Sequence, residues 1–380
     1  MARELASKDP SLVAGVEEFL NRYAAAIESL SACPRVQRLV GLKAFGIKAN
    51  PRLFVGVAVG FRPPAHVRPS LHAHDRWVHS QYVAAHGLAL TLRLRFSQEE
   101  CACVVFAGLL HDLGHPAFSH DVDHLLIGNG RLSHEERGMR WVAEDESIMN
   151  VLASVGLTPA DIIPVMAEEG SLGTIQTLAD TLGYLVLDTE VLGIPLGFSF
   201  ARTLVDAAMG LVEDCIITDQ PELFQEFLDI RAIMYRDIYY RRTHGVAATF
   251  LCKVIAALFE HSALTFADIE EETEAVIEAK IIRFLQDATT PQWLHSAWAV
   301  ANAVPAALVD WESRSYRMLA EMAAQPVSPA SSVVLQPIDY MRKTLRVWSV
   351  VGGAQQVLHA AADLHSPFCQ QWHTFTYRGE

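Results

Sequence analysis

The stretch from Cys101 to Asp123, CACVVFAGLLHDLGHPAFSHDVD, decides the fold. Its apolar run Ala102–Leu110 predicts a helix buried on most sides, and at nine residues the run is too short to cross a bilayer. The helix delivers His111 and Asp112 at its end, where a glycine and a proline break it. This pattern of a buried helix that ends in polar side chains predicts a helical core around a functional site.

Helical spacing of apolar residues continues along most of the chain. Leu12, Val16, Phe19 and Tyr23 follow the i, i+3, i+4, i+7 pattern of an amphipathic helix. The same pattern recurs at residues 77–94, 99–110, 178–192, 223–240, 246–259 and 275–285. Strand-like alternation is best at residues 52–59, where there is room for one short β-hairpin. We therefore predict an all-α fold with at most that hairpin.

Two breaks suggest how the chain is divided. Residues 60–75, GFRPPAHVRPSLHAHD, form a loop rich in proline and histidine, and residues 323–332, AAQPVSPASS, form a second break. We predict an N-terminal helical segment at residues 1–50, a core at 51–290 and a C-terminal helical region at 291–380.

Composition excludes several classes of protein. The 380 residues are 51% hydrophobic and 19% charged, which is too apolar for a disordered chain. With 30 basic and 44 acidic residues, the net charge of 30 − 44 = −14 argues against broad nucleic-acid binding but not against a small anionic ligand. Six cysteines form no CxxC pair, and residues 1–8 lack the apolar segment of a signal peptide. We expect a reduced, soluble, cytoplasmic protein without membrane contact.

Histidine and aspartate gather around the opening stretch. Ten of the 16 histidines lie between residues 66 and 134. The adjacent imidazole and carboxylate of His111 and Asp112 can reach one cation beside the helix end, and catalytic divalent metals favour such mixed ligands. Packing does not explain the groups that follow: His115, His120 and Asp123.

Further metal ligands must come from other helices. His79 lies one turn after Arg76 on an earlier predicted helix. On a later one, Asp180, Tyr184 and Asp188 follow at i, i+4 and i+8, which places them on one stripe. An acid among leucines needs a partner, and a metal ion provides one.

The order of these motifs resembles the HD-domain metal-dependent phosphohydrolases. Arg-x-x-His-Ser at residues 76–80 precedes His-Asp-Leu-Gly-His-x-x-Phe-Ser-His-x-x-Asp at 111–123, and a distal Asp180 follows. Within that group the chain most resembles the deoxynucleoside triphosphate triphosphohydrolases (dNTPase or dGTPase type). Supporting matches are Pro-x-x-Gln-Arg-Leu at residues 34–39, Ser-His-Glu at 133–135 and the Arg/Tyr helix at 231–239. Together they extend over residues 34 to 250.

The resemblance implies roles for named residues in an HD-domain helical core. The catalytic divalent metal (Mn, Fe, Co, Mg, Ni or Zn) would be bound by His79, His111, Asp112 and Asp180. The reacting phosphorus would be surrounded by catalytic residues His115, His120, Asp123 and His134. Here His120 or His134 would handle protons, and Asp123 would orient His134. Substrate binding would fall to Arg76 for a phosphate and, for the sugar and phosphate pocket, to Tyr184, Asp188, Arg231 and Tyr239.

The implied reaction is hydrolysis of nucleoside 5′-phosphates, with a (deoxy)nucleoside triphosphate giving nucleoside and tripolyphosphate. A nucleotide or other phosphorylated small molecule would be the partner, and the resemblance also implies a homo-oligomer. Three residues depart from the family pattern. Ala44 and Phe45 stand where the family places a glutamine and a leucine against the deoxyribose, and Thr181 stands in place of a phosphate-binding lysine.

Other interpretations stay open. The chain could be an HD-type phosphatase or phosphodiesterase for another phosphorylated metabolite, or an HD-type dimetal oxygenase in which His115 and His134 supply extra ligands. It could also be a sensor that binds nucleotide without turnover.

Single residues also have alternative interpretations. His134 could belong to a capping box formed by Ser133 and Glu136. Arg231 and Tyr239 could form an interfacial face. Packing or surface roles are expected for His72, His74, His86 and His124.

Overall fold

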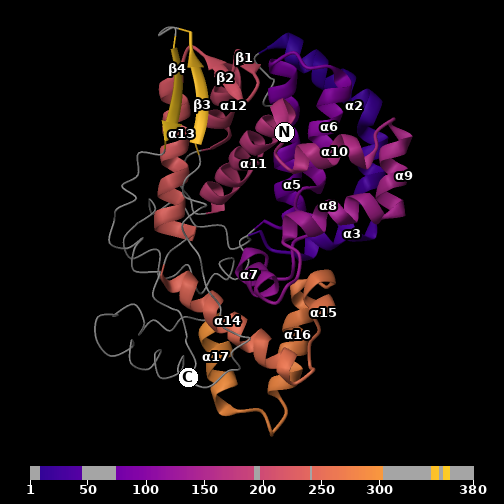
Figure 1. The fold of residues 1–380 in the computed structure, drawn as a ribbon, viewed down its shortest axis with the longest axis vertical. Coiled ribbons are helices and arrows are strands. Elements are labelled where there is room, and N and C mark those ends of the chain that lie inside the picture. Colours follow the sequence, from indigo (N-terminus) through magenta and orange to yellow (C-terminus); the bar gives the residue numbers. More distant parts are fainter. Residues whose placement is uncertain are drawn as a thin grey trace.

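The computed structural model describes residues 9–44, 74–191, 197–239, 242–302, 344–350 and 354–359. These residues form a predominantly helical protein with one small sheet (Figure 1), which confirms the predicted all-α class. The predicted hairpin at residues 52–59, Phe45 and His72 lie outside the described residues.

The helices follow the predicted positions closely. Up to residue 191 the described elements are α2 (Pro10–Ser31), α3 (Pro34–Arg38), the 3-10 turn η1 (Leu39–Gly41), α5 (Arg76–Arg93), α6 (Gln98–Leu110), α7 (His120–Gly128), α8 (His134–Glu144), α9 (Glu146–Ser154), α10 (Pro159–Met166) and α11 (Gly170–Val191). Then come α12 (Gly197–Ala207), α13 (Pro221–Met234), the π turn η4 (Tyr235–Tyr239), α14 (Arg242–Glu260), α15 (Phe266–Glu271), α16 (Glu274–Leu285) and α17 (Gln292–Asn302).

The sheet was not predicted. Its strands are β1 (Gly210–Val212), β2 (Cys215–Thr218), β3 (Thr344–Ser349) and β4 (Ala354–His359), in the order β1-β2-β3-β4. Two antiparallel hairpins meet through the parallel pair β2–β3. The C-terminal region, predicted as helical, thus contains α17 and two strands. The strands were missed because each is too short to show a clear alternation of apolar residues, and β3 is stabilised by pairing with a strand distant in the sequence. The domain boundaries at residues 50 and 290 stay a prediction.

Two hydrophobic clusters make up the described core. The first surrounds α5, α6 and α11, and the second joins α7 to α14, α16 and α17. The opening stretch passes from one cluster to the other: Leu113 belongs to the first, and Ala117, Phe118 and Val122 belong to the second. Helix α7 accordingly lies between the two groups of helices (Figure 1). The polar residues at 111–123 therefore stand where two apolar cores meet.

Small residues let three helices approach closely. A Cβ on Gly108 of α6 would come 3.0 Å from the backbone nitrogen of Ala84 in α5. A Cβ on Gly183 of α11 would come 3.0 Å from a methyl of Val83, also in α5. Helix α5 is thus pressed between α6 and α11, which draws together the polar residues that the three helices carry.

Neither disulfides nor a straight membrane span is found among the described residues. The cysteines at 33, 101, 103, 215 and 252 are free. No single described helix has both the length and the hydropathy of a bilayer span, and the bent pair α9–α10 reaches that standard only as a pair.

Gly114→Ala should destabilise the protein by about 1–3 kcal/mol, the usual cost of overpacking. The added Cβ would lie 2.1 Å from the carbonyl oxygen of His134 and 2.4 Å from the amide nitrogen of Gly138. Urea unfolding measures the change. Gly128→Ala is the control, because its Cβ would have no neighbour within 4 Å. Equal decreases in the free energy of unfolding of the two variants would contradict the close contact between Gly114 and α8.

Candidate metal centre

Helix α5 contributes His79 to the site. Asp75 caps the helix by accepting a hydrogen bond from the amide of Val78 at 2.8 Å. One turn in, the His79 side chain is 3% exposed and faces the crossing with α6 and α11. The dense packing of α5 therefore fixes this imidazole beside its neighbours.

The end of α6 contributes His111 and Asp112. The helix starts at a capping box formed by Ser97 and Glu100 and stays buried up to Leu110. The His111 Nδ1 lies 2.8 Å from the carbonyl oxygen of Gly108, which can only accept, so Nδ1 carries the proton. This bond leaves the Nε2 lone pair of neutral His111 available to a cation.

The four predicted metal ligands come together. Asp180 of α11 places Oδ1 at 3.0 Å from Nε2 of His79 and 3.5 Å from Nε2 of His111. The two histidine Nε2 atoms are 3.3 Å apart. Asp112 lies beside this group of His79, His111 and Asp180, with Oδ1 3.3 Å from His111 Nε2 and Oδ2 3.7 Å from His79 Nε2.

This arrangement fits a divalent cation. Two imidazole nitrogens at 3.3 Å repel each other unless a proton or a cation lies between them. Two nitrogen and two carboxylate ligands suit Mn²⁺, Fe²⁺, Co²⁺ or Zn²⁺. The side chain of Asp180 is 29% exposed, so one side of the group is open to water and substrate. The chain binds a divalent metal whose identity is open.

The pKa values show how strongly these groups interact without a metal. Burial lowers the pKa of His111, but Asp112 and Asp180 outweigh burial and raise it to about 9. Burial alone would raise the pKa of Asp180, yet hydrogen bonds from His111 and His79 lower it far below its ordinary value. The pKa of Asp112 is also lowered well below its usual range, because Arg76 and His111 overcome the cost of burial.

Arg76 is held against a proposed metal ligand. Its Nη1 lies 2.8 Å from Oδ2 of Asp112, its Nε donates to Oγ of Ser119 at 3.1 Å, and its Nη2 donates to the carbonyl of Ala44 at 3.0 Å. The side chain is 5% exposed. Arg76 thus joins three segments at the site, a role that the sequence did not reveal.

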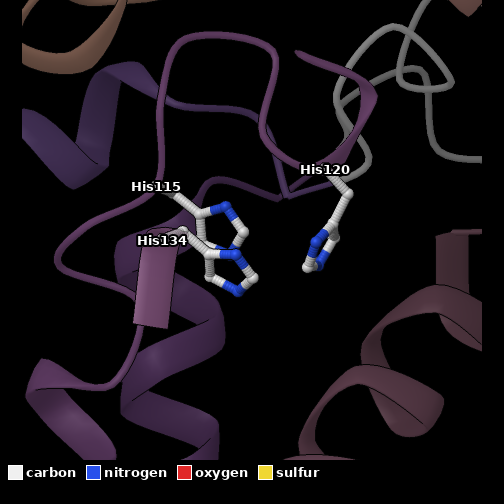
Figure 2. A group of neighbouring side chains, drawn as sticks. All are labelled: His115, His120 and His134. Atoms are coloured by element: carbon white, nitrogen blue, oxygen red, sulfur yellow. The ribbon is translucent and has the colours of Figure 1, made fainter. Parts of the chain in front are cut away.

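A second group contains three of the predicted catalytic residues: His115, His120 and His134 (Figure 2). The His115 and His134 rings are stacked with centroids 3.9 Å apart, and His120 stands edge-on to both. His120 opens α7 after two residues with positive φ, Phe118 and Ser119, which turn the chain sharply into the helix.

Asp123, the fourth predicted catalytic residue, holds His134. The His134 Nδ1 donates to Oδ2 of Asp123 at 2.7 Å, and both side chains are buried. Ser133 and Glu136 form the expected capping box, so His134 is both a helix N-terminal residue and part of the site. With Nδ1 committed to Asp123, Nε2 is the nitrogen left to face a ligand.

The two groups touch through His115. Its Nε2 lies 3.1 Å from Oδ1 of Asp112, and the side chain is fully buried. Burial, with Arg76 and His134 nearby, lowers the pKa of His115 well below its ordinary value, so the ring is neutral. The ring planes of His115 and His134 are nearly parallel, 23° apart. Because the lone pair of a ring nitrogen lies in the ring plane, the two rings are poorly oriented to bind one cation together, and contacts to oxygen suit them better.

The remaining predicted substrate residues form a separate polar cluster. Nε of Arg231 donates to the hydroxyl of Tyr184 at 2.8 Å, and the hydroxyl of Tyr239 donates to Asp188. The cluster shares α11 with Asp180, as the i, i+4, i+8 spacing predicts.

Two residues of this cluster were missed. Tyr235 lies on the π turn, with the Arg231 guanidinium 4.3 Å from its ring centroid. His74, expected in a surface or packing role, places Nε2 3.3 Å from Oδ1 of Asp188, with both side chains buried. Its position near the end of the loop predicted at residues 60–75 gave no signal of this contact.

The departures from the family pattern have structural counterparts. Ala44 contributes backbone groups: its carbonyl accepts from Arg76, and its amide donates to the carbonyl of His74 at 3.2 Å. Thr181 is buried and donates its hydroxyl to the carbonyl of Thr177 within the same helix. Neither side chain extends toward the site as a glutamine or a lysine would.

Comparisons with known proteins agree with this geometry. Residues 76–164 match the family model described as the HD domain. The match runs from α5 into α10 and contains three of the four predicted metal ligands, while Asp180 follows it.

Two further relatives extend the comparison. The Bacillus subtilis (strain 168) protein YwfO, described as uncharacterized, is 28% identical over 173 residues, which cover 43% of this chain and 39% of that protein. The chain thus spans about two-fifths of the length of this curated relative. The crystal structure of a phosphohydrolase from Bacteroides thetaiotaomicron VPI-5482 has a TM-score of 0.58 at 16% identity, covering 87% of this chain and 89% of that one, and shows the same fold.

Metal affinity should rise with pH. Below about pH 9 the metal-free protein carries a proton on His111 that a cation must displace. The association constant for Mn²⁺ should therefore increase about tenfold per pH unit through neutrality and level off above pH 9. Calorimetry in buffers of different ionisation enthalpy measures the released proton. The control is His86→Gln on α5, which should release the same proton. Metal affinity that is independent of pH would contradict the site.

Proposed function

We propose that this protein is a metal-dependent phosphohydrolase that acts on nucleoside 5′-phosphates, with a (deoxy)nucleoside triphosphate cleaved to nucleoside and tripolyphosphate. One observation carries the proposal: an open metal centre lies next to three histidines, joined by the 3.1 Å contact between His115 and Asp112. The HD domain and the fold shared with a phosphohydrolase support it.

The residues divide the work of hydrolysis between them. A divalent cation, when bound, activates water and offsets charge on a phosphoryl group. Asp123 keeps the His134 ring in the orientation that directs Nε2 away from the carboxylate, and from there Nε2 can exchange a proton with the leaving oxygen. Neutral His115 has a single N–H to donate to an oxygen and adds no charge beside a phosphoryl group.

The tyrosine cluster supports a nucleoside as the rest of the substrate. It stands one to two turns along α11 from Asp180 and offers hydroxyls from Tyr184 and Tyr239 beside the Asp188 carboxylate. Hydroxyl and carboxylate groups suit a sugar, and aromatic faces suit a base. We propose that Arg231 assists with phosphate, since a guanidinium matches its geometry. A homo-oligomeric, cytoplasmic protein stays a prediction from the sequence.

A second candidate is a phosphatase or phosphodiesterase for another phosphorylated metabolite. Ala44 and Thr181 favour it, because neither presents the polar side chain that the resemblance leads one to expect at the sugar or the outer phosphates. The dimetal oxygenase is less well supported, since the stacked His115 and His134 rings are poorly placed to bind one cation.

A product assay separates these candidates. The purified chain is incubated with Mn²⁺, Fe²⁺, Co²⁺ or Mg²⁺ and a panel of (d)NTPs, (d)NMPs and cyclic nucleotides, and products are identified by mass. Tripolyphosphate release supports the triphosphate reaction, and stepwise orthophosphate supports the phosphatase. Oxygen uptake with no turnover of any phosphorylated compound would rule out a phosphohydrolase.

Asp123→Asn should lower kcat by roughly 10²- to 10⁴-fold while metal content stays the same. The amide weakens the bond that orients His134 but leaves the four metal ligands intact. Glu135→Gln is the matched control: Glu135 also lies 3.1 Å from His134 Nδ1 but is 51% exposed, so its loss should cost less than about threefold. Equal losses in the two variants would contradict the role given to Asp123.

A further inference from the structure

Two buried arginines hold the loop between Asp112 and Pro116. Nη2 of Arg38 donates to the carbonyl oxygens of Leu113 at 3.0 Å and His115 at 2.6 Å. Nη1 of Arg137 donates to the intervening carbonyl of Gly114 at 2.5 Å. Three successive carbonyl oxygens are thus held by guanidinium groups from two other helices, α3 and α8.

Keeping these arginines buried is costly. Arg38 is 9% exposed and Arg137 is 1% exposed. Burial, together with the nearby charges of Arg137 and Arg35, lowers the pKa of Arg38 to about 9. Among the described residues no carboxylate lies within ion-pair distance of Arg38, and its hydrogen bonds go to backbone carbonyls. A buried charge whose hydrogen bonds all go to backbone carbonyl oxygens points to a need for fixed loop geometry.

The loop connects the metal centre to the group formed by His115, His120 and His134. It begins after the metal ligand Asp112 and ends at His115, whose amide donates to the Asp112 carbonyl at 3.0 Å. Gly114 packs directly on the start of α8, which carries His134. Arg137 also lies 3.6 Å from Oδ1 of Asp123, the partner of His134. The arginines therefore connect every element that places the His115–His134 stack.

We propose that Arg38 and Arg137 are positioning residues that set His115 against Asp112 and His134. The proposal rests on the proposed function, because the stack it positions is the part assigned to phosphoryl chemistry. A guanidinium fork can hold two carbonyl oxygens at fixed angles, whereas a lysine ammonium acts as a flexible point charge. Lysine at either position keeps a hydrogen-bond donor and loses the forked geometry.

Arg35 supplies a matched control. It lies on the same short helix as Arg38, and both guanidinium groups lie over the Trp141 ring, at 4.2 Å for Arg35 and 5.4 Å for Arg38. Arg35 pairs with Asp145 at 3.1 Å and, within the part of the chain that the structure describes, makes no hydrogen bond to the loop. Arg35→Lys therefore tests the packing of this helix without disturbing the carbonyls of residues 113–115.

The test compares Arg38→Lys, Arg137→Lys and Arg35→Lys in the metal-loaded full chain. In the first two we expect unchanged metal content, near-normal KM and kcat lower on the order of 10²-fold, as expected when a reacting group is misplaced by about 1 Å. Arg35→Lys should keep its kcat within a few-fold. Equal kcat losses in all three variants, or losses that follow the folded fraction in thermal melts, would overturn the proposal. Should Arg38→Lys fail to fold, Arg137→Lys decides alone.

Hydrogen exchange gives a reading that does not depend on turnover. In the wild type the His115 amide is protected by its bond to Asp112. Its exchange should be at least tenfold faster in Arg38→Lys than in Arg35→Lys, and equal rates would overturn the positioning role. A wild type that hydrolyses no phosphorylated compound but shows this difference in exchange would refute the proposed function and leave the positioning role standing.

Discussion

The Asp112 carboxylate is the group on which the rest of the site depends. It lies within 2.8 Å of Arg76, 3.3 Å of His111 and 3.1 Å of His115, and its side chain is 5% exposed. A buried carboxylate is stable only with such partners, and here they come from α5, the end of α6 and the following loop. The same group joins the metal centre to the histidine stack, so any shift of Asp112 moves both.

Two hydrophobic cores hold this carboxylate in place. The loop after Asp112 starts in one core and α7 belongs to the other, while Gly114 presses against α8. Buried arginines on α3 and α8 fix the carbonyls between them. Electrostatic interactions are strong in such surroundings because little water screens them. The exposed edge of Asp180 leaves one side through which a substrate can enter.

The sequence predicted the features that depend on local periodicity. Apolar spacing located the long helices, and His79, His111, Asp112 and Asp180 meet as the motifs predict. The β2–β3 pairing was missed because residues 215–218 and 344–349 are far apart in the sequence and come together only in the folded protein. The contact of His74 with Asp188, and the carbonyls that Arg38 holds, also depend on tertiary structure. The spacing of residues along the chain does not predict such tertiary contacts.

Anomalous scattering from crystals of the chain grown with Mn²⁺ tests the central claim most directly. We expect one strong peak, about 2.0–2.3 Å from ligand atoms of His79, His111, Asp112 and Asp180. Weak or no density within His115, His120 and His134 should accompany it. A sole peak inside that histidine group, or no bound ion at saturating Mn²⁺, would contradict the account.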